Sequence, residues 1–191
     1  ASMPPWVLDG GLEAWMARLR DPAVRAKVID DMKNPHPTWE NLYLHAGARG
    51  TLLLGFKNPK LRPLIGMTLA DVAAAREVTP EEAAIDLVIE DGSEVRVAYF
   101  FMIEDNVKRE VALPWVSFGS DSDAPAPEGI FLEASDHPRA YGNFARLLAK
   151  YVREDEVITL QEAIRKLTAL PAANLSLRLR GRLKAGYFAD V

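Results

Sequence analysis

The sequence predicts an α/β protein in which strands and helices alternate. Two apolar runs, Val95 to Met102 and Trp115 to Phe118, have the length and the β-branched and aromatic content of buried strands. Between them, Glu104 to Leu113 is expected to form a helix that Pro114 stops. A strand, a helix and a strand joined by short connections are typical of a parallel βα repeat with a right-handed crossover.

The composition fits a globular protein and argues against several other classes. With 191 residues, 49% apolar and 26% charged, the chain is long enough to bury a core. A net charge of -4 gives no electrostatic reason to expect nucleic acid or an anionic membrane as a partner. Since no apolar run reaches about 18 residues, we expect no membrane span and a cytoplasmic location. The chain has no cysteine and only three histidines, so thiolate metal sites are excluded and nitrogen ligands are few.

The first 64 residues are expected to form a segment of helices with one hairpin. Asp21 and Pro22 give the signal for a helix start, a capping side chain followed by proline at the first helical position. Gly47 and Gly50 lie between two strand-like runs at the spacing of a hairpin or a small excursion. The elements expected in this segment are helices over 10–20 and 23–32 and strands over 42–45 and 51–56.

Four further helices are predicted by their first residues or by their apolar stripes. Thr68 with Asp71, and Thr79 with Pro80 and Glu82, each have the spacing of a capped helix start. Thr159 with Glu162 repeats this pattern near the C-terminus. The helices expected are 68–76, 79–90, 143–153 and 159–170, the last of them interrupted by Pro171, and residues 181–191 have a β-like pattern.

The most informative stretch for function is Gly119-Ser120-Asp121, directly after the predicted strand at Trp115. Chemistry in α/β sheets is done at the carboxyl ends of the strands, so Asp121 is a candidate catalyst or metal ligand. On spacing alone, an Asx-turn or a helix cap is the competing interpretation. A hydrolase triad through Ser120 is disfavoured, because the segment lacks the Gly-x-Ser-x-Gly elbow.

Several long segments carry a resemblance to a known family. The segments GSD, HPRAYGNFARLLAKYVRE, ITLQEAIRKLTALPAANLSL and RGRLKAGYFADV resemble the C-terminal part of the N-acyl-D-amino-acid deacylases, also called D-aminoacylases, of the amidohydrolase superfamily. The opening PPWVLDGGLEAWMARLRDP resembles a segment that this family inserts late in its barrel. The resemblance implies the C-terminal portion of a metal-dependent-hydrolase (β/α)8 barrel, or TIM barrel. The barrel is incomplete here, because a whole one needs about 250 residues.

The same resemblance implies a division of the chain and a chemistry. Residues 1–64 match the insert, 65–178 the last βα units, and 179–191 the first strand of a returning small β-domain. The family hydrolyses the amide of an N-acyl-D-amino acid, a small molecule, with a zinc-activated water. The His-x-His pair and the other zinc ligands would lie before residue 1, so zinc is expected in the complete enzyme and not in this chain alone.

Three residues match functional positions of the family. Asp121 matches the carboxylate that takes the proton from water, and it is a metal ligand only together with the absent upstream ligands. Arg139 matches an arginine near the carboxylate of the substrate, where its fork of donors suits a planar anion. Met102 matches a methionine of the substrate pocket, with a role as core gap-filler as its alternative. Ile103 and Leu179 depart from the pattern, since each puts an apolar side chain where the family has a polar one.

Three functional interpretations follow from the sequence. The first is a fragment of a deacylase that hydrolyses nothing alone. The second is a structural fragment that self-associates, because an incomplete barrel exposes strand edges and apolar helix faces. The third is a related amidohydrolase, similar to dihydroorotase or hydantoinase, that acts on another amide.

Overall fold

The computed structural model describes residues 2–123, 126–133 and 136–189, and the chain divides into two units. The first unit comprises Ala1–Phe101 and Ala126–His137, and the second comprises Met102–Pro125 and Pro138–Val191. Among the described residues, no helix is long and apolar enough to cross a membrane. The boundaries predicted at residues 64 and 178 refer to the segments of a larger barrel and stay a prediction.

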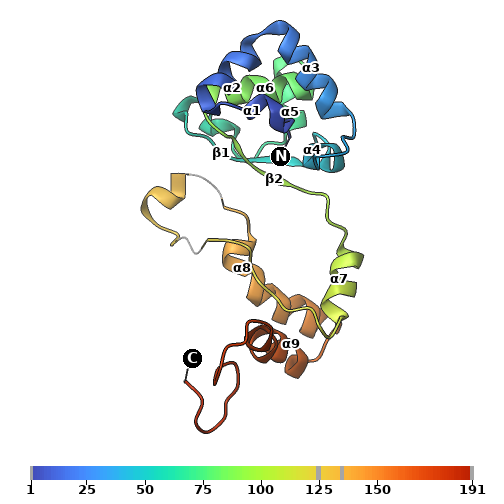
Figure 1. Cartoon of the computed structure of the whole chain (residues 1–191), viewed down its shortest axis with the longest axis vertical. Helices are drawn as coiled ribbons and strands as arrows, with labels where there is room; N and C mark the ends of the chain where they lie inside the picture. The colour runs from blue at the N-terminus through green and yellow to red at the C-terminus, as the bar shows by residue number, and fades with distance from the viewer. Residues whose placement is uncertain (1, 124–125, 134–135, 190–191) are drawn as a thin grey trace. The chain divides into compact units, whose positions relative to one another are not determined.

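The first unit consists of short helices and one pair of strands, with α1, α2, α3 and α6 gathered on one side of the pair (Figure 1). Its helices are α1 (Pro5–Leu8), α2 (Gly11–Arg20), α3 (Pro22–Lys33), α4 (Leu42–Ala46), η1 (Pro59–Leu64), α5 (Leu69–Arg76), α6 (Pro80–Asp91) and η2 (Gly129–Glu133), and its strands are β1 (Thr51–Gly55) and β2 (Arg96–Tyr99). The helices predicted over 10–20, 23–32, 68–76 and 79–90 are therefore confirmed.

Of the three predicted capping boxes, those at the starts of α5 and α6 form in full, whereas at the start of α9 the Thr159 hydroxyl accepts from the Glu162 N–H at 3.2 Å. The Thr68 hydroxyl accepts from the Asp71 N–H at 3.2 Å, and the Asp71 carboxylate accepts from the Thr68 N–H at 3.1 Å. Thr79 and Glu82 make the same reciprocal pair at 3.3 and 2.9 Å. These bonds hold the pKa values of the Asp71 and Glu82 carboxyls below their usual range, because they stabilise the ionised forms.

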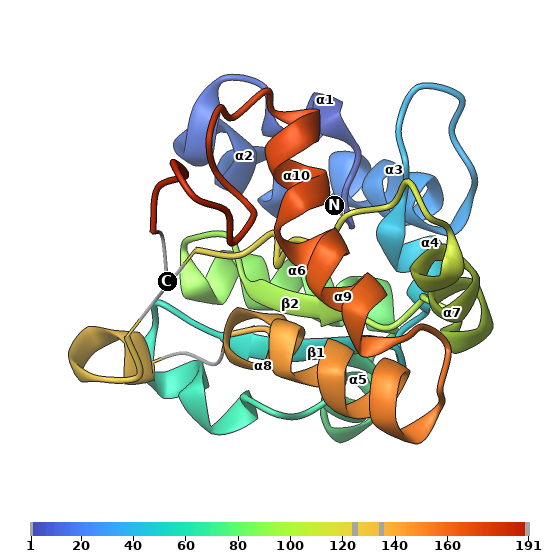
Figure 2. The ribbon, with the colours of Figure 1, turned by 90° about the horizontal axis from the view of Figure 1, so that it is seen from below.

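The strand pair joins segments that are far apart in the sequence. β1 and β2 run antiparallel with Thr51 opposite Tyr99, and the register shifts between Leu53 and Gly55 (Figure 2). Gly50 precedes β1 where a side chain has no room, since a Cβ there would overlap the Ala46 carbonyl oxygen. The runs expected at 51–56 and 95–102 thus contain the strands Thr51–Gly55 and Arg96–Tyr99, but β2 pairs with β1 and not with a parallel neighbour.

The hairpin expected between 42–45 and 51–56 is wrong, because the first of these runs is helix α4. Asn41 decides this outcome. Its side-chain oxygen accepts from the Leu44 N–H at 3.1 Å and caps the helix, and its amide donates to the Met32 carbonyl at 2.7 Å. The bond to Met32 of α3 holds Asn41 in place as the N-cap of α4. The alternation of apolar residues in 42–45 does not indicate this cap.

The second unit is built from helices. They are α7 (Glu104–Ala112), α8 (Arg139–Arg146), η3 (Leu147–Glu154), α9 (Leu160–Leu167) and α10 (Ala169–Asn174). The helix predicted over 104–113 is confirmed, and the one predicted over 143–153 begins earlier, at Arg139. Its second half, η3, has π-type winding, with the Asp155 N–H donating to the Lys150 carbonyl at 2.7 Å. The helix predicted over 159–170 breaks at Thr168 into the consecutive α9 and α10, before Pro171 is reached (Figure 2).

The core of the second unit is small and includes a buried lysine. Lys166 of α9 is fully buried, and its ammonium donates to the Val111 carbonyl and, at 2.6 Å, to the Leu113 carbonyl. These carbonyls lie at the C-terminal end of α7, where a cation is favourable. Burial lowers the pKa of the Lys166 ammonium.

The strand expected at 115–118 is wrong, and with it the parallel βα repeat. Residues 114 and 115 form a turn, 116–120 have no regular structure, and Trp115 is 67% exposed. A strand needs neighbours for its backbone N–H and C=O groups, and the described chain supplies none beside this run. Residues 181–189 likewise form turns and bends without a strand, and 190–191 lie outside the described residues. The described chain is helix-rich with one two-stranded sheet and forms no closed barrel.

The C-terminal segment after α10 packs back on that helix through Gly181. This residue has a φ of 75°, and a Cβ there would lie 2.7 Å from the Ala172 Cβ and from the Thr168 carbonyl oxygen. Only glycine fits both the conformation and the space. Further along the segment, the Phe188 N–H donates to the Leu179 carbonyl at 2.9 Å.

Candidate functional site

The candidate site lies in the second unit, on the segment that follows α7. Asp121 has a φ of 49°, in the left-handed region that aspartate tolerates better than most residues. Its side chain is 91% exposed. The carboxylate therefore projects from an irregular turn and not from the end of a strand.

Helix α8 holds this turn at two points. The Arg139 guanidinium Nη2 lies 3.2 Å from Asp121 Oδ2, and the Asn143 side-chain amide donates to the Gly119 carbonyl at 3.0 Å. Arg139 and Asn143 are four residues apart and therefore share one face of the helix. One helical turn thus positions both the backbone and the carboxylate of the Gly119–Asp121 segment.

Two of the three residues predicted to be functional come together. Asp121 and Arg139 form an ion pair within the second unit. Met102 lies outside this pair, directly before α7, and is 77% exposed. The roles of the three residues stay predictions.

The sequence analysis did not identify Asn143 or Lys166. Lys166 lies three residues after the buried Ala163 and therefore on the inward face of α9, a position that a charged side chain occupies only when it has partners. That periodicity is a usable signal. Nothing in the sequence near Asn143 indicates its bond to Gly119, because the bond spans 24 residues.

Ile103 and Leu179, the two departures from the family pattern, are both exposed. Ile103 is the N-cap of α7 and is 62% exposed. Leu179 is 48% exposed and has a φ of 58°, which is uncommon for a residue with a branched side chain. Each adds apolar surface to the second unit.

The described residues do not by themselves fit a zinc site. Residues 2–123, 126–133 and 136–189 contain no group of three or more His, Cys, Asp or Glu that could hold a metal ion. The Asp121 carboxylate is paired with a guanidinium, which competes with a cation for the same oxygen. A metal ion at Asp121 would therefore need ligands from outside the described residues.

Comparisons with known proteins agree on one family, although no family model matches. The chain is 39% identical over 126 residues to N-acyl-D-glutamate deacylase of Alcaligenes xylosoxydans xylosoxydans, covering 66% of this chain and 23% of that protein. It is 35% identical to D-aminoacylase of the same organism over 67% of this chain and 24% of the relative. The chain thus spans about a quarter of the length of these curated relatives.

Solved structures give the same result. The N-acyl-D-glutamate deacylase of Bordetella bronchiseptica, solved with zinc and a phosphonate inhibitor that mimics the tetrahedral intermediate, matches with a TM-score of 0.63 and 30% identity over 88% of this chain and 35% of that chain. A D-aminoacylase studied for its binuclear metal centre matches with a TM-score of 0.62 and 30% identity over 78% of this chain and 28% of that chain.

Proposed function

We propose that this chain, which belongs to the N-acyl-D-amino-acid deacylase family, is part of a zinc-dependent amidohydrolase that removes the acyl group from N-acyl-D-amino acids. The observation that carries the proposal is the ion pair of Asp121 with Arg139, which joins the two polar residues that the family pattern assigns to catalysis and substrate binding. The complete enzyme would contain a (β/α)8 barrel to which this chain contributes the last part. A cytoplasmic location stays a prediction.

In this proposal the residues of the chain have separate tasks. The Asp121 carboxylate accepts a proton from the attacking water and returns it to the leaving amine. The Arg139 guanidinium binds the carboxylate of the substrate, and Met102 contributes apolar surface to the pocket. The pairing of Asp121 with Arg139 suits a site that awaits its substrate, because a substrate carboxylate would take over the guanidinium.

Zinc belongs to the proposal only for the complete enzyme. Bound zinc would supply an activated water there. Since the described residues do not fit a zinc site, this chain alone is expected to bind no zinc tightly and to hydrolyse nothing.

The proposal is tested in a chimera, because the chain spans about a quarter of its relatives. In the N-acyl-D-glutamate deacylase of Alcaligenes xylosoxydans xylosoxydans, the matching quarter is replaced by this chain. We expect the chimera to hydrolyse N-acyl-D-glutamate. Asp121→Asn should lower kcat by about 10²–10⁴-fold, the usual contribution of a general acid or base. Arg139→Lys should raise KM with less effect on kcat, because lysine keeps the charge and loses the fork.

The control is Asp123→Asn, which removes a nearby exposed carboxylate and should leave both constants unchanged. Full activity of the Asp121→Asn chimera would contradict the proposed proton transfer. Rapid hydrolysis by the isolated chain with added zinc would contradict its inactivity. Preference of the chimera for a cyclic amide such as dihydroorotate or a hydantoin would favour the related amidohydrolase.

A second candidate, self-association without a catalytic role, is favoured by the apolar surface of the second unit. Several large apolar side chains there are more than 60% exposed, namely Met102, Ile103, Trp115, Leu175 and Leu183. Exposed apolar surface of this kind marks contact sites or aggregation. Sedimentation velocity should show concentration-dependent association, and a monomer at all concentrations would count against it.

A further inference from the structure

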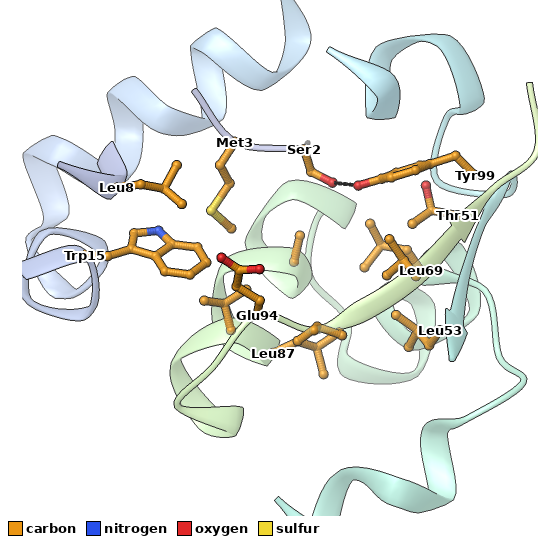
Figure 3. A pocket seen from close by; sticks show the side chains of 14 residues that line it. Ser2, Met3, Leu8, Trp15, Thr51, Leu53, Leu69, Leu87, Glu94 and Tyr99 are labelled. Carbon is orange, nitrogen blue, oxygen red and sulfur yellow. Dashed lines mark hydrogen bonds between the residues drawn. The ribbon is translucent and has the colours of Figure 1, made fainter. Parts of the chain in front are cut away.

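The first unit contains a cavity of about 360 Å³ among the side chains of its core (Figure 3). Its walls come from six elements of the first unit, and the leucines that line it include Leu53 of β1, Leu69 of α5 and Leu87 of α6. An aliphatic cavity of about 150 Å³ is large enough for benzene, and ligand pockets begin at about 300 Å³. The volume therefore suits a ring with a short side chain.

The polar groups of the wall include three hydroxyl oxygens that can accept hydrogen bonds. The hydroxyls of Ser2 and Tyr99 bond to each other, as Figure 3 shows, and the Thr51 hydroxyl donates to the Gly47 carbonyl at 2.9 Å. After these bonds are made, the hydroxyl oxygens still have lone pairs, and one hydroxyl of the Ser2–Tyr99 pair also keeps a proton that it can donate. A ligand that donates several hydrogen bonds would be complementary to this part of the wall.

The charge of the wall is negative. Of the fourteen lining residues, Glu94 is the one that carries a charge, and it is exposed. Trp15, which also lines the cavity, offers an aromatic ring of the kind that attracts cations. An anionic ligand would meet the Glu94 carboxylate, and the fourteen described lining residues include no Lys, Arg or His, which disfavours an N-acyl amino acid here.

We infer that this cavity binds a small ammonium compound with an apolar body, of the arylalkylamine class. The ring fills the space between Leu53, Leu69 and Leu87, and the ammonium lies toward Glu94 and the hydroxyls. The site lies in the first unit and is independent of the proposed deacylase chemistry. Failure of this inference would therefore not affect the role proposed for Asp121, and failure of that role would not affect this inference.

The test uses the whole chain and two probes of matched size and opposite charge, 2-phenylethylammonium and 3-phenylpropionate. Binding is measured by titration calorimetry and by the NMR signal of the Trp15 indole N–H, which is buried and has no hydrogen-bond acceptor among the described residues. We expect saturable binding of the ammonium probe with a shift of the Trp15 signal. The anionic probe should bind at least about tenfold more weakly, since its charge is repelled by Glu94.

Three variants sharpen the test. Glu94→Gln should weaken the ammonium probe by about threefold to fivefold, as expected for one exposed charge. Glu13→Gln, a matched change of an exposed glutamate on α2 outside the cavity, should have no effect. Ala84→Phe should abolish binding by filling the space, with an NMR spectrum to check folding. Equal binding of both probes, no binding of the ammonium probe at millimolar concentration, or no effect of Glu94→Gln would each overturn the inference.

Discussion

The two units bury very different amounts of apolar surface. Among the described residues, the main cluster of the first unit contains eighteen buried apolar side chains, whereas the cluster of the second contains four. The second unit compensates with polar contacts, among them the buried Lys166 and the pairing of Asp155 with Lys108 and Lys150 at 3.1 and 2.9 Å. Burial of apolar surface is the dominant favourable contribution to folding. The first unit should therefore be the more stable of the two, and the second should respond more strongly to pH and to loss of a single charge.

The largest effect is expected in the first unit, for Gly50→Ala. The new Cβ would overlap the Ala46 carbonyl oxygen and lie 2.9 Å from that of Phe100, and backbone atoms cannot move aside cheaply. We expect a loss of about 3 kcal/mol or more in the free energy of unfolding. Amide hydrogen exchange, measured residue by residue, should show the loss in the first unit and little change in the second. A loss below about 0.5 kcal/mol would mean that a side chain is tolerated at position 50, next to the carbonyl oxygens of Ala46 and Phe100.

The next effect is expected in the second unit, for Lys166→Met. Methionine keeps much of the volume but leaves the Val111 and Leu113 carbonyls without their charged donor. We expect a loss of about 2 kcal/mol, the usual scale for hydrogen bonds to a charged group. Hydrogen exchange in α7 and α9 measures it, with the exposed Lys184→Met as the control. A more stable variant would show that removing the buried charge outweighs the lost bonds.

Acidification should distinguish the units through Asp155. Its bonds from Lys150 and Lys108 hold the pKa of the Asp155 carboxyl below the usual value, because they stabilise the ionised form. The stability that this group contributes is present above its unfolded pKa of about 4 and is lost as pH falls through the lower folded pKa.

We expect the second unit to unfold first in an acid titration followed by NMR. The first unit also has carboxyls with lowered pKa, Asp71 and Glu82, but its larger core should delay unfolding. Asp155→Asn should remove part of the acid dependence of the second unit. An unchanged profile in that variant would show that other carboxylates govern it.

The smallest effect is a gain, for Gly142→Ala. Gly142 lies inside α8, and a Cβ there would meet nothing within 4 Å. Alanine should stabilise the helix by about 0.5–1 kcal/mol, because glycine loses more backbone freedom on folding. Thermal unfolding of the second unit measures the gain. Gly142→Ala and Gly50→Ala are the same substitution, but we expect the first to raise the free energy of unfolding and the second to lower it.

Local signals in the sequence predicted the helices well. Thr68 with Asp71 and Thr79 with Glu82 bond within their own first turns, so their spacing suffices to predict the starts of α5 and α6. Signals that depend on distant partners failed. Asn41 caps α4 while bonded to Met32, and the run at 115–118 lacks neighbouring strands. The pairing of β1 with β2 also spans more than 40 residues, beyond what alternation alone can predict.

The candidate site was predictable in part. Asp121 was singled out by its place after an apolar run, and Arg139 by the family resemblance alone. That the two side chains form an ion pair follows from the position of α8, which the sequence does not fix. Asn143 could not be predicted, because its partner is the backbone carbonyl of Gly119 and every residue type provides such a carbonyl.

The π-type winding of η3 makes the second unit sensitive to chain length at one place. Because η3 continues α8, any residue deleted between Leu147 and Glu154 would allow the helix to return to ordinary winding. Each residue of an α-helix turns the chain by about 100°, and a π-type turn closes its hydrogen bond over one additional residue. Deleting one residue from η3 would therefore remove that additional residue and leave the segment that follows close to its present orientation, whereas inserting one residue would rotate it. We expect a single deletion in η3 to be tolerated better than a single insertion.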